Sequence, residues 1–300
     1  VSAGRREEAI GIAEELAAAK PDDPASAVGL AIVYARNAEH DSALDVLKRC
    51  AVSFPDFTQG RIELGKLLLM FEQPAAARGH FEAALHLQPG RAEIHMLYAL
   101  ALHGLERYQD SVVQMEHACA LEPTVSVRKQ LAAGLIMACR YPEAIALYVE
   151  MLHHDQVQRN EVVGNYACAL AYAGRLDEAL GFLDEALSQH SFDPALRMMR
   201  AIIHLLNERY GQGWDDYEWR NFSNSRNYRV LPFAKWRGEP LRGKRIVVLA
   251  EQGIGDQVMF ASCIEDLTRQ GCEKIVVEAM HRVAKTLTRS LPNCEVISTS

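Results

Sequence analysis

The chain has 300 residues, of which 49% are hydrophobic and 24% charged, a composition typical of a globular protein and a length that suits about two domains. No apolar run approaches the roughly 20 residues needed to cross a bilayer, so we expect no contact with a membrane. The net charge of −7 is uneven, because residues 1–222 contain 20 Lys and Arg against 31 Asp and Glu, whereas residues 223–300 contain 12 against 8. The acidic balance of the longer part argues against nucleic acid as a partner.

The first two thirds of the chain repeat with a period of 34 residues. In each unit a small residue is followed four positions later by a large one, seven later by another small one and, in the clearest units, twelve later by Pro. The clearest instances are Ala43, Leu47, Cys50, Pro55; Ala77, Phe81, Ala84, Pro89; and Ser111, Met115, Ala118, Pro123. Small residues let two antiparallel helices approach closely, and Pro ends the second helix of a pair. The pattern therefore predicts stacked helix pairs.

This pattern resembles the tetratricopeptide repeat (TPR) family over roughly residues 3–222, with about six repeats and a partial one at the N-terminus. The resemblance implies a right-handed superhelix whose concave face is lined by the first helix of each pair. Members of the family bind peptides or protein segments on that face. We therefore expect a mainly α-helical protein whose partner is a protein or peptide in the TPR groove.

The expected groove surface is mixed and largely apolar. From the repeat phase, it should include Val28, Ile32, Lys66, Leu69, Met96, Leu100, His103, Lys129 and Ala133. The asparagine ladder of the O-GlcNAc transferase superhelix is reduced here to Asn165. A paired Lys, Asn and Arg clamp for a C-terminal carboxylate is not evident.

Seven Cys without any C-x-x-C pair predict buried free thiols, which favours a reducing, cytoplasmic compartment. The eleven His lack partners at metal-ligand spacing, so we expect no metal site and no cofactor.

Residues 223–243 contain two Gly and two Pro and predict an extended connector. The basic residues of this region, such as Lys235 and Arg237, are interpreted as a solvated linker or a contact with the acidic helices; an anionic ligand is the alternative.

Residues 244–300 change period and predict β-α-β-α-β, the first half of a Rossmann-like doubly wound sheet. The expected elements are a buried strand at 245–250, a glycine loop at 251–256, a helix at 257–269, a strand at 274–279, a helix at 282–291 and a strand from 295. On the first of these helices, Val258 and Phe260 belong to the expected apolar side. The loop lacks the third Gly of the dinucleotide fingerprint, since Val258 takes that position.

Trp236-x-Gly-x-x-Leu-x-Gly-Lys, followed by a strand and then Glu251-Gln-Gly-Ile-Gly-Asp256, resembles the junction of bacterial TPR proteins fused to a two-lobed, heptosyltransferase-like glycosyltransferase domain. The resemblance implies a ligand-binding loop at Gln252, Gly253 and Gly255. It also implies that Asp256 is the general base, taking a proton from an acceptor hydroxyl. The alternative is that Asp256 only caps the following helix.

Two functions follow from these patterns. The first is a scaffold that binds a protein partner through the repeats. The alternative is the N-terminal part of a glycosyltransferase whose repeats present a protein acceptor. Because the sugar-nucleotide lobe would lie beyond residue 300, we expect a nucleotide sugar to bind only with that lobe present, and this chain alone to be inactive.

Overall fold

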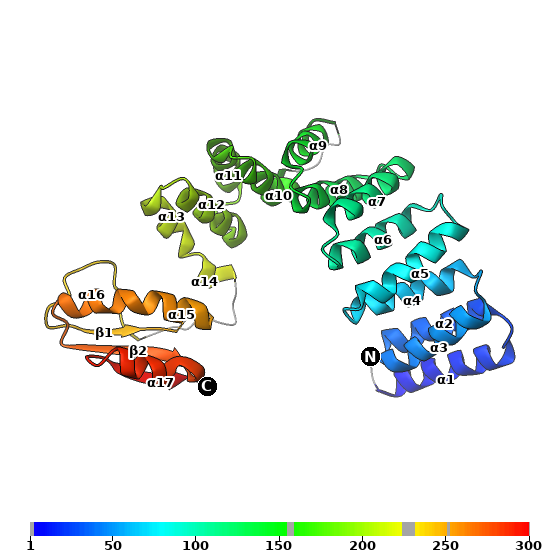
Figure 1. Ribbon diagram of the computed structural model, residues 1–300, viewed down its shortest axis with the longest axis horizontal. Coiled ribbons are helices and arrows are strands. Elements are labelled where there is room, and N and C mark those ends of the chain that lie inside the picture. Colours follow the sequence, from blue (N-terminus) through cyan, green and yellow to red (C-terminus); the bar gives the residue numbers. More distant parts are fainter. Residues whose placement is uncertain (1–2, 155–158, 224–231, 251–252, 300) are drawn as a thin grey trace. The chain divides into compact units, whose positions relative to one another are not determined.

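The computed structural model describes residues 3–154, 159–223, 232–250 and 253–299. It divides into two compact units, Val1–Arg220 and Asn221–Ser300. Within the described residues, the first contains helices only, and the second combines a small sheet with helices (Figure 1). The chain is therefore mainly α-helical.

The helical unit is a stack of antiparallel helix pairs, preceded by α1 (Ala3–Ala19). The first helices of the pairs are α2 (Pro24–Arg36), α4 (Thr58–Met70), α6 (Ala92–Gly104), α8 (Val125–Met137), α10 (Arg159–Tyr172) and α12 (Pro194–Leu206). The second helices are α3 (His40–Ser53), α5 (Pro74–Leu87), α7 (Tyr108–Leu121), α9 (Tyr141–His154), α11 (Leu176–Gln189) and α13 (Tyr210–Tyr217), and the short α14 (Arg220–Ser223) follows. Through α13, each helix packs against the helices before and after it in the chain. The predicted helix pairs are therefore confirmed, while the right-handed path of the stack stays a prediction.

Small residues lie where the two helices of a pair cross. Ala43, Ala77, Ala144 and Ala179 are completely buried at the position that the repeat reserves for a small side chain. In the third pair this position is Ser111, whose buried hydroxyl donates to the Ala99 carbonyl at 2.7 Å. Its polar group therefore has a partner, as burial requires.

The turn inside each pair contains one residue with a positive φ, and only one of the six is Gly. These residues are Ala38, Glu72, Glu106, Cys139, Gly174 and Glu208. In each turn, the amide of the next residue donates to a carbonyl five residues earlier, for example Gln73 to Leu68 at 2.9 Å and Arg209 to His204 at 2.8 Å. This bond closes the end of the first helix in the manner of a Schellman motif.

The last pair is joined by a buried carboxylate. Asp216 of α13 is 5% exposed and accepts hydrogen bonds from Arg200 at 2.6 and 2.9 Å and from Arg197 at 3.2 Å. Arg197 also lies over the ring of Trp219, 4.2 Å from its centroid. The two cations offset the cost of burying the Asp216 charge.

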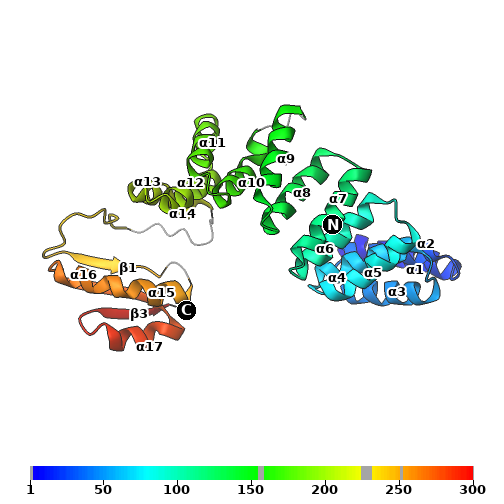
Figure 2. The ribbon, with the colours of Figure 1, turned by 45° about the horizontal axis from the view of Figure 1, so that its top comes forward.

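In the part of the second unit that the structure describes, three parallel strands, β1 (Arg245–Val248), β2 (Lys274–Met280) and β3 (Glu295–Thr299), form a sheet in the order β1-β2-β3. The connections carry α15 (Ile254–Phe260), the 3-10 turn η1 (Ala261–Cys263), α16 (Ile264–Arg269) and α17 (His281–Ser290) (Figure 2). Ile275, Val277 and Ala279 of β2 are buried together with Val283 and Leu287 of α17. The predicted order of strands and helices in this unit is thus observed.

Three sequence expectations for this unit were wrong in detail. β1 is an edge strand, and Val247 is 38% exposed rather than buried. The single helix expected at 257–269 begins at Ile254 and is interrupted by η1. On its expected apolar side, Val258 and Phe260 are more than half exposed. Among the residues of α15, η1 and α16, all of them described, only Ile264, which follows the interruption, is buried.

The cysteines also differ from expectation. All seven are free thiols, but only Cys50 is buried, and Cys139 and Cys263 are exposed. Burial raises the pKa of the Cys50 thiol. A helical stack has a large surface for its core, so helix position alone does not bury a residue.

Candidate functional site

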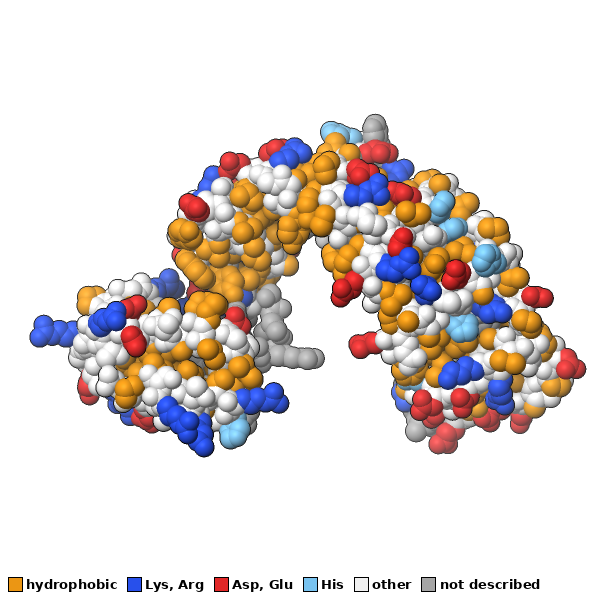
Figure 3. Space-filling model, in the orientation of Figure 1, with side chains coloured by type: hydrophobic (Ala, Val, Ile, Leu, Met, Phe, Trp, Pro, Cys, Tyr) orange, Lys and Arg blue, Asp and Glu red, His pale blue; other side chains and the backbone are white. Residues whose placement is uncertain are grey.

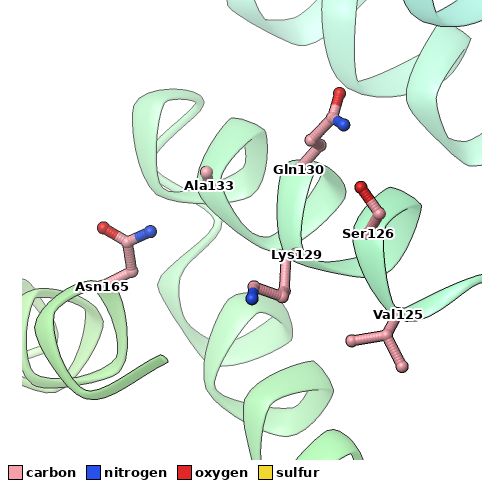
Figure 4. A pocket seen from close by; sticks show the side chains of 6 residues that line it. All are labelled: Val125, Ser126, Lys129, Gln130, Ala133 and Asn165. Carbon is pink, nitrogen blue, oxygen red and sulfur yellow. The ribbon is translucent and has the colours of Figure 1, made fainter. Parts of the chain in front are cut away.

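A cavity of about 490 Å³ lies on the first helices, between α8 and α10 (Figure 4). It is lined by Val125, Ser126, Lys129, Gln130, Ala133 and Asn165. The close-up shows Lys129 of α8 and Asn165 of α10 projecting into the same space from neighbouring helices. The structure therefore brings together two of the predicted partner-binding residues, with Ala133 beside them.

The sequence of α8 explains why these side chains face outward. Val127, Leu131 and Leu135 are buried on one side of the helix, so Lys129, Gln130 and Ala133 lie on the other. Thr124 caps the start of the helix by accepting from the Val127 amide at 3.3 Å. This cap fixes the turn that carries the lining residues Val125 and Ser126.

Sequence reasoning missed Val125 and Ser126. Ser126 precedes Lys129 by three positions and Gln130 by four, so it shares their side of the helix. Extending the predicted face by one turn toward the N-terminus would have found it.

Lys66, another predicted partner-binding residue, lies in a charged network on α4 and α6. Its ammonium group donates to Glu93 at 2.9 Å and to Glu63 at 3.1 Å, and Arg91 also pairs with Glu93. Burial opposes the charge of Lys66, but the hydrogen bonds to Glu93 and Glu63 outweigh it and raise its pKa. Lys66 is therefore cationic at neutral pH and shared between two carboxylates.

The other predicted residues of this face differ in exposure. Leu100 is 55% exposed, and His103 is exposed with its ring edge-on to Tyr108 at 5.2 Å. Ile32, Leu69 and Met96 are half-buried and pack against the helical cores. Val28 was expected on this face but is 5% exposed and belongs to the core. Figure 3 shows hydrophobic, acidic and basic side chains mixed on the visible surface of the helical unit.

The glycine loop of the second unit leads into α15. Gly253 occupies the N-cap position, with Gly255 and Asp256 in the first helical turn. Asp256 is thus not the N-cap residue, although a carboxylate in the first turn is favoured by the helix dipole. A Cβ at Gly253 would lie 3.7 Å from Asp256 Oδ2, so the two residues are close. Gln252, predicted in this loop, lies outside the described residues.

Glu278 of β2 is the buried acid of the second unit. It is 6% exposed and accepts a hydrogen bond from the Ala250 amide at 3.1 Å. The contact ties the end of the β1 segment to the central strand, so Glu278 has a structural role.

The described residues offer neither a metal site nor a membrane-spanning helix. No group of three or more His, Cys, Asp or Glu side chains in the described ranges could hold a metal ion. No described helix combines the length and apolar character that a membrane crossing requires.

Comparison with known proteins agrees with the repeat pattern. The model of the tetratricopeptide repeat family matches residues 1–56, 62–115 and 166–213, more than half of the chain. Protein FlbA of Caulobacter vibrioides is 27% identical over 282 residues, which cover 89% of this chain and 46% of FlbA. The chain therefore spans about half the length of this curated relative.

Solved structures share the helical fold. YrrB, described as a TPR protein with an unusual peptide-binding site, is 17% identical with a TM-score of 0.54, over 61% of this chain and 95% of that one. A tetratricopeptide repeat protein from Parabacteroides merdae is 14% identical with a TM-score of 0.54, over 71% of this chain and 86% of that one. At these identities the likeness concerns the fold alone.

Proposed function

This chain belongs to the tetratricopeptide repeat family, and from that membership we propose that its helical unit binds a segment of another protein along the first helices. Proteins of this family bind protein or peptide partners. The proposed surface runs over Ile32, Lys66, Leu69, Met96, Leu100, His103, Lys129 and Asn165.

The cavity between α8 and α10 carries this proposal. Its volume of about 490 Å³ falls within the roughly 300–1,000 Å³ of ligand pockets, enough for a few residues of a peptide. The Asn165 amide can donate to and accept from a peptide backbone, and the Lys129 ammonium can donate to a carbonyl or carboxylate. Ala133 and Val125 supply apolar surface beside these polar groups.

A selection of random displayed peptides on the whole chain, followed by calorimetry with an enriched peptide, tests the proposal. The double variant Lys129→Ala, Asn165→Ala should bind about tenfold more weakly, because it removes the hydrogen bonds that both side chains contribute in the cavity. Lys48→Ala, an exposed lysine on the second helix α3, is the matched control and should bind normally. Equal affinity of the wild type and the double variant for every enriched peptide would refute the proposal.

A second candidate function concerns residues 244–300. We propose that they form the first part of a Rossmann-like lobe of the two-lobed glycosyltransferase type, joined by the connector 223–243 to the repeats at 1–222. The supporting observation is the parallel β-α-β-α-β order with Gly253 at the start of α15 and Asp256 in its first turn.

In this second proposal Asp256 acts as the general base. Its carboxylate takes the proton of an acceptor hydroxyl as that oxygen attacks the sugar carbon of a nucleotide-sugar donor, and the nucleoside diphosphate leaves. Gln252, Gly253 and Gly255 form the loop beside the acceptor, and the repeats present a protein acceptor.

Mass spectrometry of sugar transfer tests this candidate. The assay uses the natural polypeptide that carries this sequence, incubated with a panel of nucleotide sugars and candidate acceptor proteins. Asp256→Asn should lower the rate by about 10²–10⁴-fold, whereas Asp266→Asn on the neighbouring α16 should not. A normal rate for Asp256→Asn, or no transfer from any donor, would count against it.

A further inference from the structure

An apolar row follows the ends of the first helices. The last residue of α4, α8, α10 and α12 is in each case a large apolar residue that is 45–64% exposed: Met70, Met137, Tyr172 and Leu206. In α6 the last residue is Gly104, and Leu100, one turn earlier on the same side, is 55% exposed. Single exposed apolar residues are ordinary, but here one lies at or one turn before the end of each of five successive first helices.

Three carboxylates accompany this row. Glu72, Glu106 and Glu208 follow α4, α6 and α12 by two residues, and all three are exposed at the turn position with positive φ. Gly or Asn adopts this conformation more readily, since a side chain there costs roughly 1–2 kcal/mol. Ala38 and Cys139 share this conformation in other turns, so what distinguishes these three turns is the exposed negative charge of their Glu side chains.

The cations of the repeat turns are already paired, with an acid of the same repeat for Arg107 and Arg175 and with Asp177 of the preceding repeat for Arg209. Arg107 pairs with Asp110 at 2.7 Å, Arg175 with Glu178 at 2.5 Å and Arg209 with Asp177 at 2.6 Å. In contrast, within the described ranges no Lys or Arg nitrogen lies within 4.0 Å of the carboxylates of Glu72, Glu106 or Glu208. The edge of the apolar row therefore carries uncompensated negative charge.

The repeat spacing selects the conformation of a ligand. Among the helices of the row, α4 contacts α6, α8 contacts α10 and α10 contacts α12. Packed helices lie roughly 8–10 Å apart between axes. A polyproline II segment returns a side chain to the same face every three residues, about 9.3 Å. A β-strand does so every two residues, about 6.6 Å, which does not match one repeat.

We propose that the apolar row and its three glutamates bind a basic, polyproline II segment of another protein, with an apolar residue at every third position and Lys or Arg between. Each apolar residue contacts one repeat, and the cations lie beside Glu72, Glu106 and Glu208. This inference rests on the proposed protein-binding function and specifies the ligand that the first helices accept.

Fluorescence anisotropy with synthetic peptides on the whole chain tests the inference. The probe carries Leu at every third position with Lys and Pro between. The first comparison peptide has the same composition but carries Leu at alternate positions. The second keeps the spacing of the probe and has Glu in place of Lys. The first probe should bind at least about tenfold more tightly than either comparison peptide. Equal binding of the three peptides would overturn the inference.

Chain variants locate the contact. A double variant of the apolar row, Met137→Ser with Tyr172→Ser, should weaken binding of the first probe about tenfold. A triple variant of the carboxylates, Glu72→Gln with Glu106→Gln and Glu208→Gln, should weaken binding by a similar factor, and this factor should shrink at high salt. Val52→Ser and Glu82→Gln, exposed on the second helices α3 and α5, are the matched controls and should bind normally. Normal binding by both sets of row variants would overturn the inference.

The displayed-peptide selection separates this inference from the proposed function. Enriched peptides that depend on Lys129 and Asn165 but lack the three-residue spacing would overturn the inference and leave the proposed function intact. A selection that enriches no peptide would overturn both.

Discussion

Gly65 illustrates how closely the two helices of a repeat approach. A Cβ at this position would lie 2.5 Å from the ring of Phe81, which is completely buried and has no room to move. Gly65→Ala should therefore lower the free energy of unfolding by about 1–3 kcal/mol. Urea denaturation of the whole chain measures this change.

Gly79 is the matched control for Gly65. It lies on the exposed side of α5, and a Cβ there would meet nothing within 4 Å. Gly79→Ala should raise the free energy of unfolding by up to about 1 kcal/mol, because Ala has the higher helix propensity. A loss of stability equal to that of Gly65→Ala would contradict the packing account.

Tyr148 links stability to alkaline pH. Its side chain is 1% exposed, and burial raises its pKa from 10.0 to about 12. The folded state therefore holds this proton where the unfolded state has lost it, so stability is fully present below pH 10 and is lost as pH rises toward 12. This rise in the pKa of Tyr148 corresponds to a loss of up to about 3 kcal/mol in the free energy of unfolding.

The variant Tyr148→Phe isolates this contribution. It should change the free energy of unfolding at pH 7 by no more than about 1 kcal/mol, but it should lose less stability than the wild type between pH 9 and pH 11. Urea denaturation at both ends of this interval gives the comparison. Parallel pH profiles for the two proteins would show that Tyr148 does not titrate in this way.

Several residue roles followed from the sequence, and others required coordinates. The small residue at each helix crossing was evident from the 34-residue phase, as was the position of Asn165 on a first helix, where it lines the cavity; its partner-binding role stays a prediction. The positive φ of Glu72, Glu106 and Glu208 was not evident, because sequence preferences assign that conformation to Gly or Asn. The uneven exposure of Ile32 and Leu100 depends on the neighbouring repeats, which helix periodicity does not specify.

At the scale of elements, α12 and α13 depend on one carboxylate. Asp216→Asn would leave Arg197 and Arg200 side by side without the charge that joins them. We expect Asp216→Asn to lower the free energy of unfolding by about 3–5 kcal/mol, and we expect this helix pair to be destabilised most. Amide hydrogen exchange should then be faster in α12 and α13 and unchanged in α4 and α5.

Asp184 provides the control for Asp216. It also contacts Arg200, at 2.6 Å, but its side chain is 56% exposed. Asp184→Asn should cost less than about 1 kcal/mol, because water screens an exposed ion pair. If both variants lowered the free energy of unfolding equally, burial of the carboxylate would not determine how much each ion pair stabilises the fold.

Elements were predicted unequally well along the chain. Helices of the repeats were readable because each unit repeats the same small and large positions, so one instance supports the next. The elements of residues 244–300 occur once each. Hydrophobic content at 245–250 indicated a strand but not that it lies at the edge, and the apolar side of 257–269 did not reveal the interruption at Ala261–Cys263.

At the scale of the whole molecule, the chain combines an acidic stack of repeats with a small parallel α/β unit. In the proposed function, the stack supplies a long surface of similar positions, and a bound partner segment would gain affinity from many small contacts along it. The α/β unit supplies a glycine loop with an acid in the following helical turn. The proposed division of roles is recognition by the stack and, in the second candidate function, chemistry at the loop.

Site-specific photo-crosslinking tests the central claim, binding of a protein segment along the first helices. A photoreactive phenylalanine analogue is placed at Ala133, beside Lys129 and Asn165, or at Val52, which is exposed on the second helix α3. With a display-selected peptide, the account predicts a crosslink from position 133 and none from position 52. Crosslinking from position 52 alone would contradict it.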